Sequence, residues 1–238
     1  MRDQVVLLRH SYRFGSDSAI GRLASAVNRG QGEEARDLLQ AEDGADQIEW
    51  MHADPAAFAA HRYAALFDKL DAGLPVEELF EEQRSFRVLC ALRSGPQGMQ
   101  QMNREIARHL TRLGKLTPDC EWYPGRPVMV TRNDYALGLY NGDLGLVCPH
   151  PQERDQLAVA FPAADAETRW VAPARLGACE TVFAMTVHKS QGSEFREVLL
   201  QLPHQSSPVL CRELIYTAVT RARAVSYTHL TLPTTRLV

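Results

Sequence analysis

The chain has 238 residues, 45% of them hydrophobic, and a formal net charge of −3. This composition suits one large or two small packed domains, and its charge argues against a protein that coats nucleic acid through bulk positive charge. The sequence contains no apolar run near the roughly 20 residues of a membrane helix and no CxxC pair among its five cysteines, so we expect a cytoplasmic protein with reduced thiols.

The N-terminal residues alternate strand and helix signals. Val5–Leu8 is typical of a buried strand, and Ser11–Phe14 follows it directly. Ser16 or Asp17 can then cap a helix with an apolar stripe, which Gly30 ends. Because a buried strand lies so near the start, we expect the chain to begin inside a longer protein.

Residues 32–83 have helical periodicity, punctuated by Asp54-Pro55, which can cap and begin a helix, and by Gly73-Leu74-Pro75. Four acids gather in the last of these helices, at Glu77, Glu78, Glu81 and Glu82. Such a group can hold a metal ion, but acids spaced in this way usually form a solvated helix face. We predict no metal site in this chain.

A second strand-to-helix unit follows, with a strand at Arg87–Leu92 and helical spacing between Gly95 and Gly114. The polar face of this helix carries four cations, Arg104, Arg108, Arg112 and Lys115. This basic ridge either contacts DNA phosphate or a partner subunit, with Asn103 and Arg104 as candidates, or is simply solvated.

Between residues 122 and 178 the period changes from 3.6 to two. Short alternating runs are expected as strands, at Pro127–Thr131, Leu137–Tyr140, Leu144–Cys148, Leu157–Phe161 and Thr168–Val171. Asn141-Gly142 lies between two of these runs and is a strong signal for a tight hairpin turn. We expect a small antiparallel barrel.

The segment Thr186–Phe195 (TVHKSQGSEF) lies between two apolar runs of strand length, Val182–Met185 and Val198–Leu202. Its hydroxyls, the Lys189 cation, the permissive backbone at Gly192 and one acid suit phosphate binding at the end of a buried strand. Composition alone leaves an ordinary capped loop equally open.

This segment resembles motif V of superfamily 1 helicases in its RecD-like form. Leu214–Arg223 resembles motif VI, Ser11–Phe14 resembles motif IV, and the resemblance extends from Val5 to Arg223. It implies an α/β fold: the second RecA-like motor domain, with a parallel sheet, in residues 1–121 and 179–224, and an SH3-like β-barrel inserted at 122–178. Val225–Val238 departs from the family, looks like a non-native tail, and is left out of the expected fold.

The resemblance also implies roles for single residues. Arg13 and Arg221 would face the γ-phosphate of ATP and act in catalysis, although Arg13 can also be a plain surface arginine. Gly192 and Glu194 would contact the nucleotide. The remaining roles fall to Thr186, His188 and Lys189 for DNA binding and to Gln191 for coupling.

The sequence contains no GxxxxGK[ST] loop, so the phosphate cradle and the Mg²⁺ ligands are expected on another domain and this chain alone is expected to be inactive. By resemblance, the function is that of an ATP-dependent 5′–3′ helicase subunit of exodeoxyribonuclease V. Its partners would be single- and double-stranded DNA and the RecB and RecC subunits. The alternatives are a stand-alone RecD-like helicase and a catalytically silent scaffold for DNA or proteins.

Overall fold

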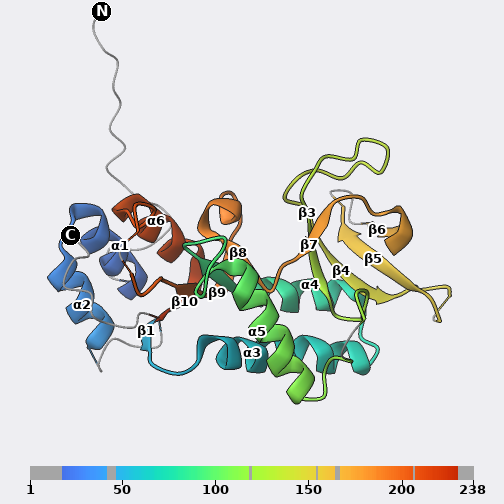
Figure 1. Ribbon diagram of the computed structural model, residues 1–238, viewed down its shortest axis with the longest axis horizontal. Coiled ribbons are helices and arrows are strands. Elements are labelled where there is room, and N and C mark those ends of the chain that lie inside the picture. The colour runs from blue at the N-terminus through green and yellow to red at the C-terminus, as the bar shows by residue number, and fades with distance from the viewer. Residues whose placement is uncertain are drawn as a thin grey trace, which may run out of the picture.

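A computed structural model describes residues 18–41, 47–117, 120–153, 155–163, 167–205 and 207–229 (Figure 1). The expected strand Val5–Leu8 lies outside these residues. The helices are α1 (Ala19–Arg29), α2 (Gly32–Gln40), α3 (Pro55–Asp71), α4 (Val76–Ser85), α5 (Met99–Arg112) and α6 (Arg212–Val219), with short 3₁₀ turns η2 (Pro173–Arg175) and η3 (Val187–Ser190). None of the described helices has the length and apolarity needed to span a membrane.

The strands form two separate sheets. The first contains β1 (Ile48–Met51), β2 (Phe86–Cys90), β8 (Ala184–Thr186), β9 (Phe195–Gln201) and β10 (Ala222–His229). The second contains β3 (Pro127–Val130), β4 (Leu144–Pro149), β5 (Leu157–Pro162), β6 (Thr168–Val171) and β7 (Cys179–Thr181).

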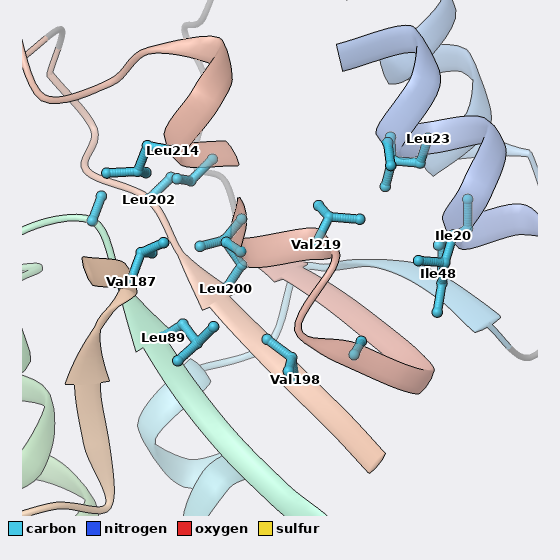
Figure 2. Close-up of a cluster of buried hydrophobic side chains, with 14 of the residues drawn as sticks. Ile20, Leu23, Ile48, Leu89, Val187, Val198, Leu200, Leu202, Leu214 and Val219 are labelled. Carbon is cyan, nitrogen blue, oxygen red and sulfur yellow. The ribbon is translucent and has the colours of Figure 1, made fainter. Parts of the chain in front are cut away.

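The first sheet is parallel throughout, in the order β1-β10-β9-β2-β8. Side chains alternate between its faces, as the strand period of two requires. Leu89 and Leu200 pack in a cluster with α1 and α6, whereas Leu199 packs in a cluster with α3 and α5. Figure 2 shows the first of these clusters, where Val219 of α6 and Ile20 of α1 lie over the strands. The expected α/β fold with a parallel sheet is confirmed.

Local signals set the helix ends. Ser18 caps α1, its hydroxyl oxygen accepting from the Gly21 amide at 3.0 Å, and Gly30 ends the helix with φ 73°. Asp54 caps α3, its carboxylate accepting from the Ala56 amide at 2.9 Å. The predicted positions of these ends at Gly30 and Asp54 are confirmed, whereas the cap of α1 is Ser18.

β10 corrects the sequence analysis. The sequence predicts a non-native tail from Val225 onward, but Val225–His229 belongs to a strand that pairs in parallel with both β1 and β9. Backbone pairing needs only an extended chain, and Val225, Tyr227 and Thr228 are residue types that suit a strand. Removal of these residues would leave β1 without the neighbour that joins it to the sheet.

The second sheet is antiparallel, in the order β6-β5-β4-β3-β7. Four of the five expected runs form strands, but Leu137–Tyr140 does not: it lies in the β3–β4 connection, where one isolated bridge joins Asp134 and Leu139. The strand that pairs with β4 is β3, so Asn141-Gly142 is a turn at the end of a longer connection, with φ 103° at Gly142. In the described strands β6 and β7 are the two edges, and the closed barrel remains a prediction.

Both faces of the antiparallel sheet are covered. Val128, Val147 and Val159 share one cluster, whereas Leu146 and Ala160 pack with residues of α3 and α4 in another. Its last strand, β7, reaches Thr181, three residues beyond the expected boundary at 178. Because β7 leads almost directly into β8, the two sheets are joined just ahead of the 186–195 segment.

Buried hydroxyls on β10 give a test of its place in the sheet. Thr228 is 4% exposed and its hydroxyl oxygen has no hydrogen-bond partner, whereas the buried Thr220 donates to the Tyr216 carbonyl at 2.8 Å. We expect Thr228→Val to stabilise the chain by about 1 kcal/mol, because a buried unsatisfied hydroxyl is removed without a change of shape. The matched control, Thr220→Val, should destabilise it by about 1 kcal/mol.

Unfolding of the 238-residue chain in denaturant measures both changes. Equal destabilisation by the two substitutions would contradict the burial of β10 between β1 and β9.

Candidate functional site

The 186–195 segment runs from the carboxyl end of β8 back to the amino end of β9, at the opposite ends of the strands of the parallel sheet. It begins at Thr186, the last residue of β8, and ends at Phe195, the first residue of β9. Thr186 is level with Cys90, and Cys90 is level with Gln201 at the far end of β9. The two ends of the segment are therefore separated by about 20 Å along the strands, at about 3.3 Å per residue.

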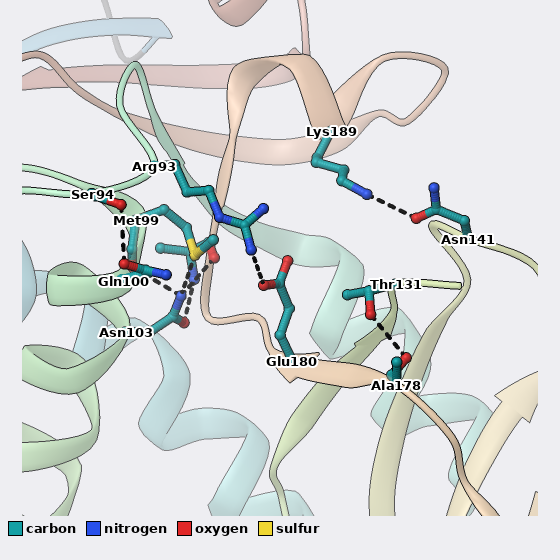
Figure 3. A network of polar contacts seen from close by, with 11 residues as sticks. Arg93, Ser94, Met99, Gln100, Asn103, Thr131, Asn141, Ala178, Glu180 and Lys189 are labelled. Atoms are coloured by element: carbon teal, nitrogen blue, oxygen red, sulfur yellow. Dashed lines mark hydrogen bonds and ion pairs between the residues drawn. The ribbon is translucent and has the colours of Figure 1, made fainter. Parts of the chain in front are cut away.

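The first end lies at the carboxyl edge of the sheet and carries the three residues predicted to bind DNA. Thr186 ends β8, His188 is exposed on η3, and Lys189 is partly exposed. The Lys189 ammonium donates to the Asn141 side-chain oxygen at 2.8 Å (Figure 3). The structure thus brings these residues together and adds Asn141, whose sequence signal indicated only a turn.

Asn103 holds the strand that leads into this end. Its amide nitrogen donates to the Ala184 carbonyl at 2.8 Å, and its amide oxygen accepts from the Ala184 backbone N–H at 3.0 Å. β8 is an edge strand of the parallel sheet, so this side chain supplies the backbone partners that a further strand would provide. Asn103 is 8% exposed and therefore acts on β8 as a structural partner.

The expected basic ridge on α5 is divided. Arg108 pairs with Glu105 at 2.6 Å, and Lys115 pairs with Asp68. Arg104 is exposed and lines an open hollow together with Gly95, Pro96, Gln100, Gln101 and Glu105. The acidic helix is also paired in part, since Glu82 contacts Lys69 at 2.7 Å and Glu81 contacts Arg84 at 3.1 Å.

The second end lies at the amino edge of β9 and meets motif VI. α6 ends at Val219, so Arg221 lies in the turn before β10. Its guanidinium donates to the Ser193 carbonyl at 3.1 Å and to the Thr217 carbonyl at 3.2 Å, and its own carbonyl accepts from the Phe195 amide at 3.0 Å. The two motifs that the sequence analysis singled out are therefore in direct contact.

Glu194 and Gly192 complete this end. Glu194 forms an ion pair with Arg223 at 2.5 Å. Gly192 has φ 85°, a conformation that favours glycine, and nothing lies within 4 Å of where a Cβ would stand. The other arginine predicted to face phosphate, Arg13, lies outside the described residues.

Arg87 contacts the start of β9 at the second end, a role for which the sequence offered only one cue, a lone arginine in an apolar run. It is fully buried, its guanidinium donates to the carbonyls of Val182 and Gln83, and it lies 5.2 Å from the centre of the Phe195 ring. Burial lowers the pKa of this guanidinium. Arg87 therefore ties the residues before β8 to the start of β9.

This arrangement fits an anionic ligand at the second end. A permanently charged guanidinium contacts the residue after Gly192, which has open space at its Cβ position, and two of its acceptors are neutral carbonyls that a phosphate oxygen would outcompete. Among the described residues, no group of three or more His, Cys, Asp or Glu side chains is placed to hold a metal ion.

Comparison with known proteins gives three kinds of match. Residues 181–227 match the UvrD-like helicase C-terminal domain. The chain is 41% identical over 232 residues to "RecBCD enzyme subunit RecD" of Mycolicibacterium smegmatis, covering 92% of this chain and 38% of that protein. It is 38% identical over 143 residues to "ATP-dependent RecD2 DNA helicase" of Deinococcus radiodurans, covering 58% of this chain and 19% of that protein.

Among solved structures, Pif1 helicase from Bacteroides in complex with ADP-AlF3 and ssDNA matches 72% of this chain and 49% of its own, with 18% identity and a TM-score of 0.38. The chain thus spans well under half of the length of the curated relatives it matches.

The Asn103 contact can be tested by substitution. Asn103→Leu leaves the Ala184 N–H and C=O buried without these partners, so we expect it to destabilise the chain by about 2 kcal/mol or more. Arg104→Leu, on the exposed face of the same helix, is the control and should change stability by less than about 0.5 kcal/mol. Denaturant unfolding measures both, and equal effects would show that the Asn103 contact contributes nothing.

Proposed function

Over 92% of its length the chain belongs to the RecD family, and on this premise we propose that it forms the second RecA-like motor domain of an ATP-dependent 5′–3′ DNA helicase subunit. The enzyme would be of the exodeoxyribonuclease V type and act in double-strand break repair and recombination, in the cytoplasm. The single observation that supports this most is the direct contact between the 186–195 segment and Arg221.

The nucleotide would bind at the second end of the segment. Arg221 and Arg13 would face the γ-phosphate, and Gly192 and Glu194 would contact the nucleotide from the segment. When bound, ATP supplies the phosphoryl group whose transfer to water releases the free energy for movement. Arg221 would release the Ser193 and Thr217 carbonyls and donate instead to the phosphoryl oxygens. Its guanidinium can donate two parallel hydrogen bonds, which would stabilise the negative charge on these oxygens.

The other half of the nucleotide site would come from another domain of the full-length protein. The phosphate-cradling GxxxxGK[ST] loop does not occur in this sequence, so the Mg²⁺ ligands are assigned to that domain. We accordingly assign no ATPase activity to the 238-residue chain alone.

DNA would bind at the first end, through Thr186, His188 and Lys189. We assign the antiparallel sheet, which ends with β7 at Thr181, to an SH3-like barrel inserted between two parts of the motor domain, residues 1–121 and the part that contains β8, β9, α6 and β10. In the full-length protein the partners would be single- and double-stranded DNA and the RecB and RecC subunits. Gln191, between the two ends, would couple the nucleotide to the DNA.

A stand-alone helicase is the second candidate, because the chain also resembles the RecD2 helicase of Deinococcus radiodurans. That resemblance covers 58% of the chain, compared with 92% for the RecD subunit. The wider coverage favours the RecBCD-type subunit.

Arg221 provides the test of the motor function. In the full-length protein, Arg221→Ala should lower ATP hydrolysis at saturating single-stranded DNA by about 10³-fold or more, as loss of an arginine that stabilises phosphoryl charge does elsewhere. Arg221→Lys should recover little, because an ammonium lacks the planar fork of donors.

Arg212→Ala, an exposed arginine at the start of α6, is the matched control and should stay within about threefold of wild type. Thermal unfolding of each variant verifies the fold. Hydrolysis by Arg221→Ala at the level of this control would remove Arg221 from the catalytic set and contradict the proposed function.

A further inference from the structure

The connection between β3 and β4, residues 131–143, presents two tyrosine rings to solvent. Tyr135 is 78% exposed, the highest value among the large apolar side chains of the described residues, and Tyr140 is 53% exposed. Their ring centroids are 6.2 Å apart, with an angle of 78° between the ring planes. Two aromatic rings that contact each other and otherwise face water are an unusual use of apolar surface.

The backbone of this connection is fixed from within. Asp134 and Leu139 exchange two backbone hydrogen bonds, at 2.7 and 2.9 Å, and the Leu139 side chain is buried. The Asp134 carboxylate accepts from the Leu137 amide at 3.0 Å, and the Asp143 carboxylate accepts from the Tyr140 amide at 2.8 Å. Both acids of the connection are thus engaged with its own backbone.

Asn133 links the Tyr135 ring to the turn at Asn141. Its amide nitrogen donates to the Tyr135 hydroxyl at 3.2 Å, and its amide oxygen accepts from the Asn141 backbone N–H at 2.8 Å. Arg169 closes the other side by donating to the carbonyls of Leu137 and Gly138, at 2.8 and 2.5 Å. The backbone that carries both rings and the Tyr135 hydroxyl are therefore held before any ligand binds, which reduces the entropy lost on binding.

The connection that carries the rings contacts the first end of the 186–195 segment. Asn141, the neighbour of Tyr140 in the chain, accepts the hydrogen bond from Lys189. Figure 1 shows the β3–β4 connection rising beside the segment that follows β8, and Figure 3 shows the contact itself. Arg132 adds an exposed cation within the connection.

We propose that Tyr135 and Tyr140 form a stacking platform for the bases of single-stranded nucleic acid whose backbone is bound at Lys189. This inference rests on the proposed function, which places DNA at the first end of the segment. Every base has a π-face, so stacking on tyrosine is tolerant of sequence, as a motor that moves along its track requires. The neighbouring cations suit the phosphates of the same strand.

The test uses the 238-residue chain and a fluorescently labelled oligothymidine, with binding followed by anisotropy at several salt concentrations. Tyr135→Ala and Tyr140→Ala should each weaken binding by about fivefold or more, which is the range for loss of one stacked base. Tyr135→Phe and Tyr140→Phe keep the rings and should bind nearly as wild type. The salt dependence should stay unchanged in all four variants, because no phosphate contact is removed.

Two controls separate stacking from other causes. An oligonucleotide of equal length with abasic residues should bind wild type and the alanine variants equally, since it offers phosphates without bases. Lys189→Ala should instead reduce the slope of log affinity against log salt by about 0.7. Leu113→Ala, an exposed apolar residue at the end of α5, should bind as wild type.

The outcomes distinguish this inference from the proposed function. If the alanine variants bind oligothymidine as well as wild type does, the platform is wrong while the motor assignment stands. The same holds if the alanine substitutions weaken binding to the abasic strand as much as they weaken binding to oligothymidine. If wild type does not bind single-stranded DNA, the DNA-binding assignment of the segment fails and the platform fails with it.

Discussion

Pairing of β2 with both β8 and β9 fixes the two ends of the 186–195 segment at opposite edges of one sheet. A slip of either strand by one residue would turn its buried side chains to the other face, so this register is strongly determined. Arg87 on β2 reinforces it, by donating to the Val182 carbonyl and lying against the Phe195 ring. Any ligand at one end of the segment is therefore joined by a short stretch of chain to any ligand at the other.

This arrangement offers a physical route by which the proposed nucleotide and DNA sites would communicate. Lys189 lies at the first end, bonded to the antiparallel sheet through Asn141, and Ser193 lies at the second end, bonded to Arg221. In each contact a cationic side chain donates to a neutral oxygen atom, and an anionic phosphate can replace that oxygen at modest cost, whereas the bond from the Phe195 amide to the Arg221 carbonyl remains. Binding of DNA and of nucleotide would thus each remove one restraint from the same segment.

The sequence predicted what local pattern controls. Gly30 located the end of α1, Asp54 located the start of α3, and apolar runs located β2, β8 and β9. The prediction was wrong for β1, because Ile48–Met51 lies within residues 32–83, which were expected to be helical. Sequence pattern did not predict which segments pair as strands. Leu137–Tyr140 alternates like a strand, but the strand that pairs with β4 is β3. β10 was not predicted because the residues after Ala224 look like a non-native tail, and its buried positions include the polar Ser226 and Thr228.

The candidate site shows the same division. Motif residues were identifiable from their order along the chain, whereas their supports come from distant positions: Asn103 is 81 residues from Ala184, Arg87 is 95 from Val182, and Asn141 is 48 from Lys189. No local pattern reports such contacts, because they depend on how the strands are ordered in the sheets.

Coupling between the two ends is measured most directly as the affinity of the full-length protein for single-stranded DNA with and without a non-hydrolysable ATP analogue. If the segment connects the sites, the analogue should change that affinity by about fivefold or more. Insertion of two glycines after Gln191, in an exposed stretch, should bring the ratio of DNA affinities with and without the analogue close to one. DNA and the analogue should each still bind to this variant in the absence of the other. An unchanged ratio in the insertion variant would contradict the role of the segment.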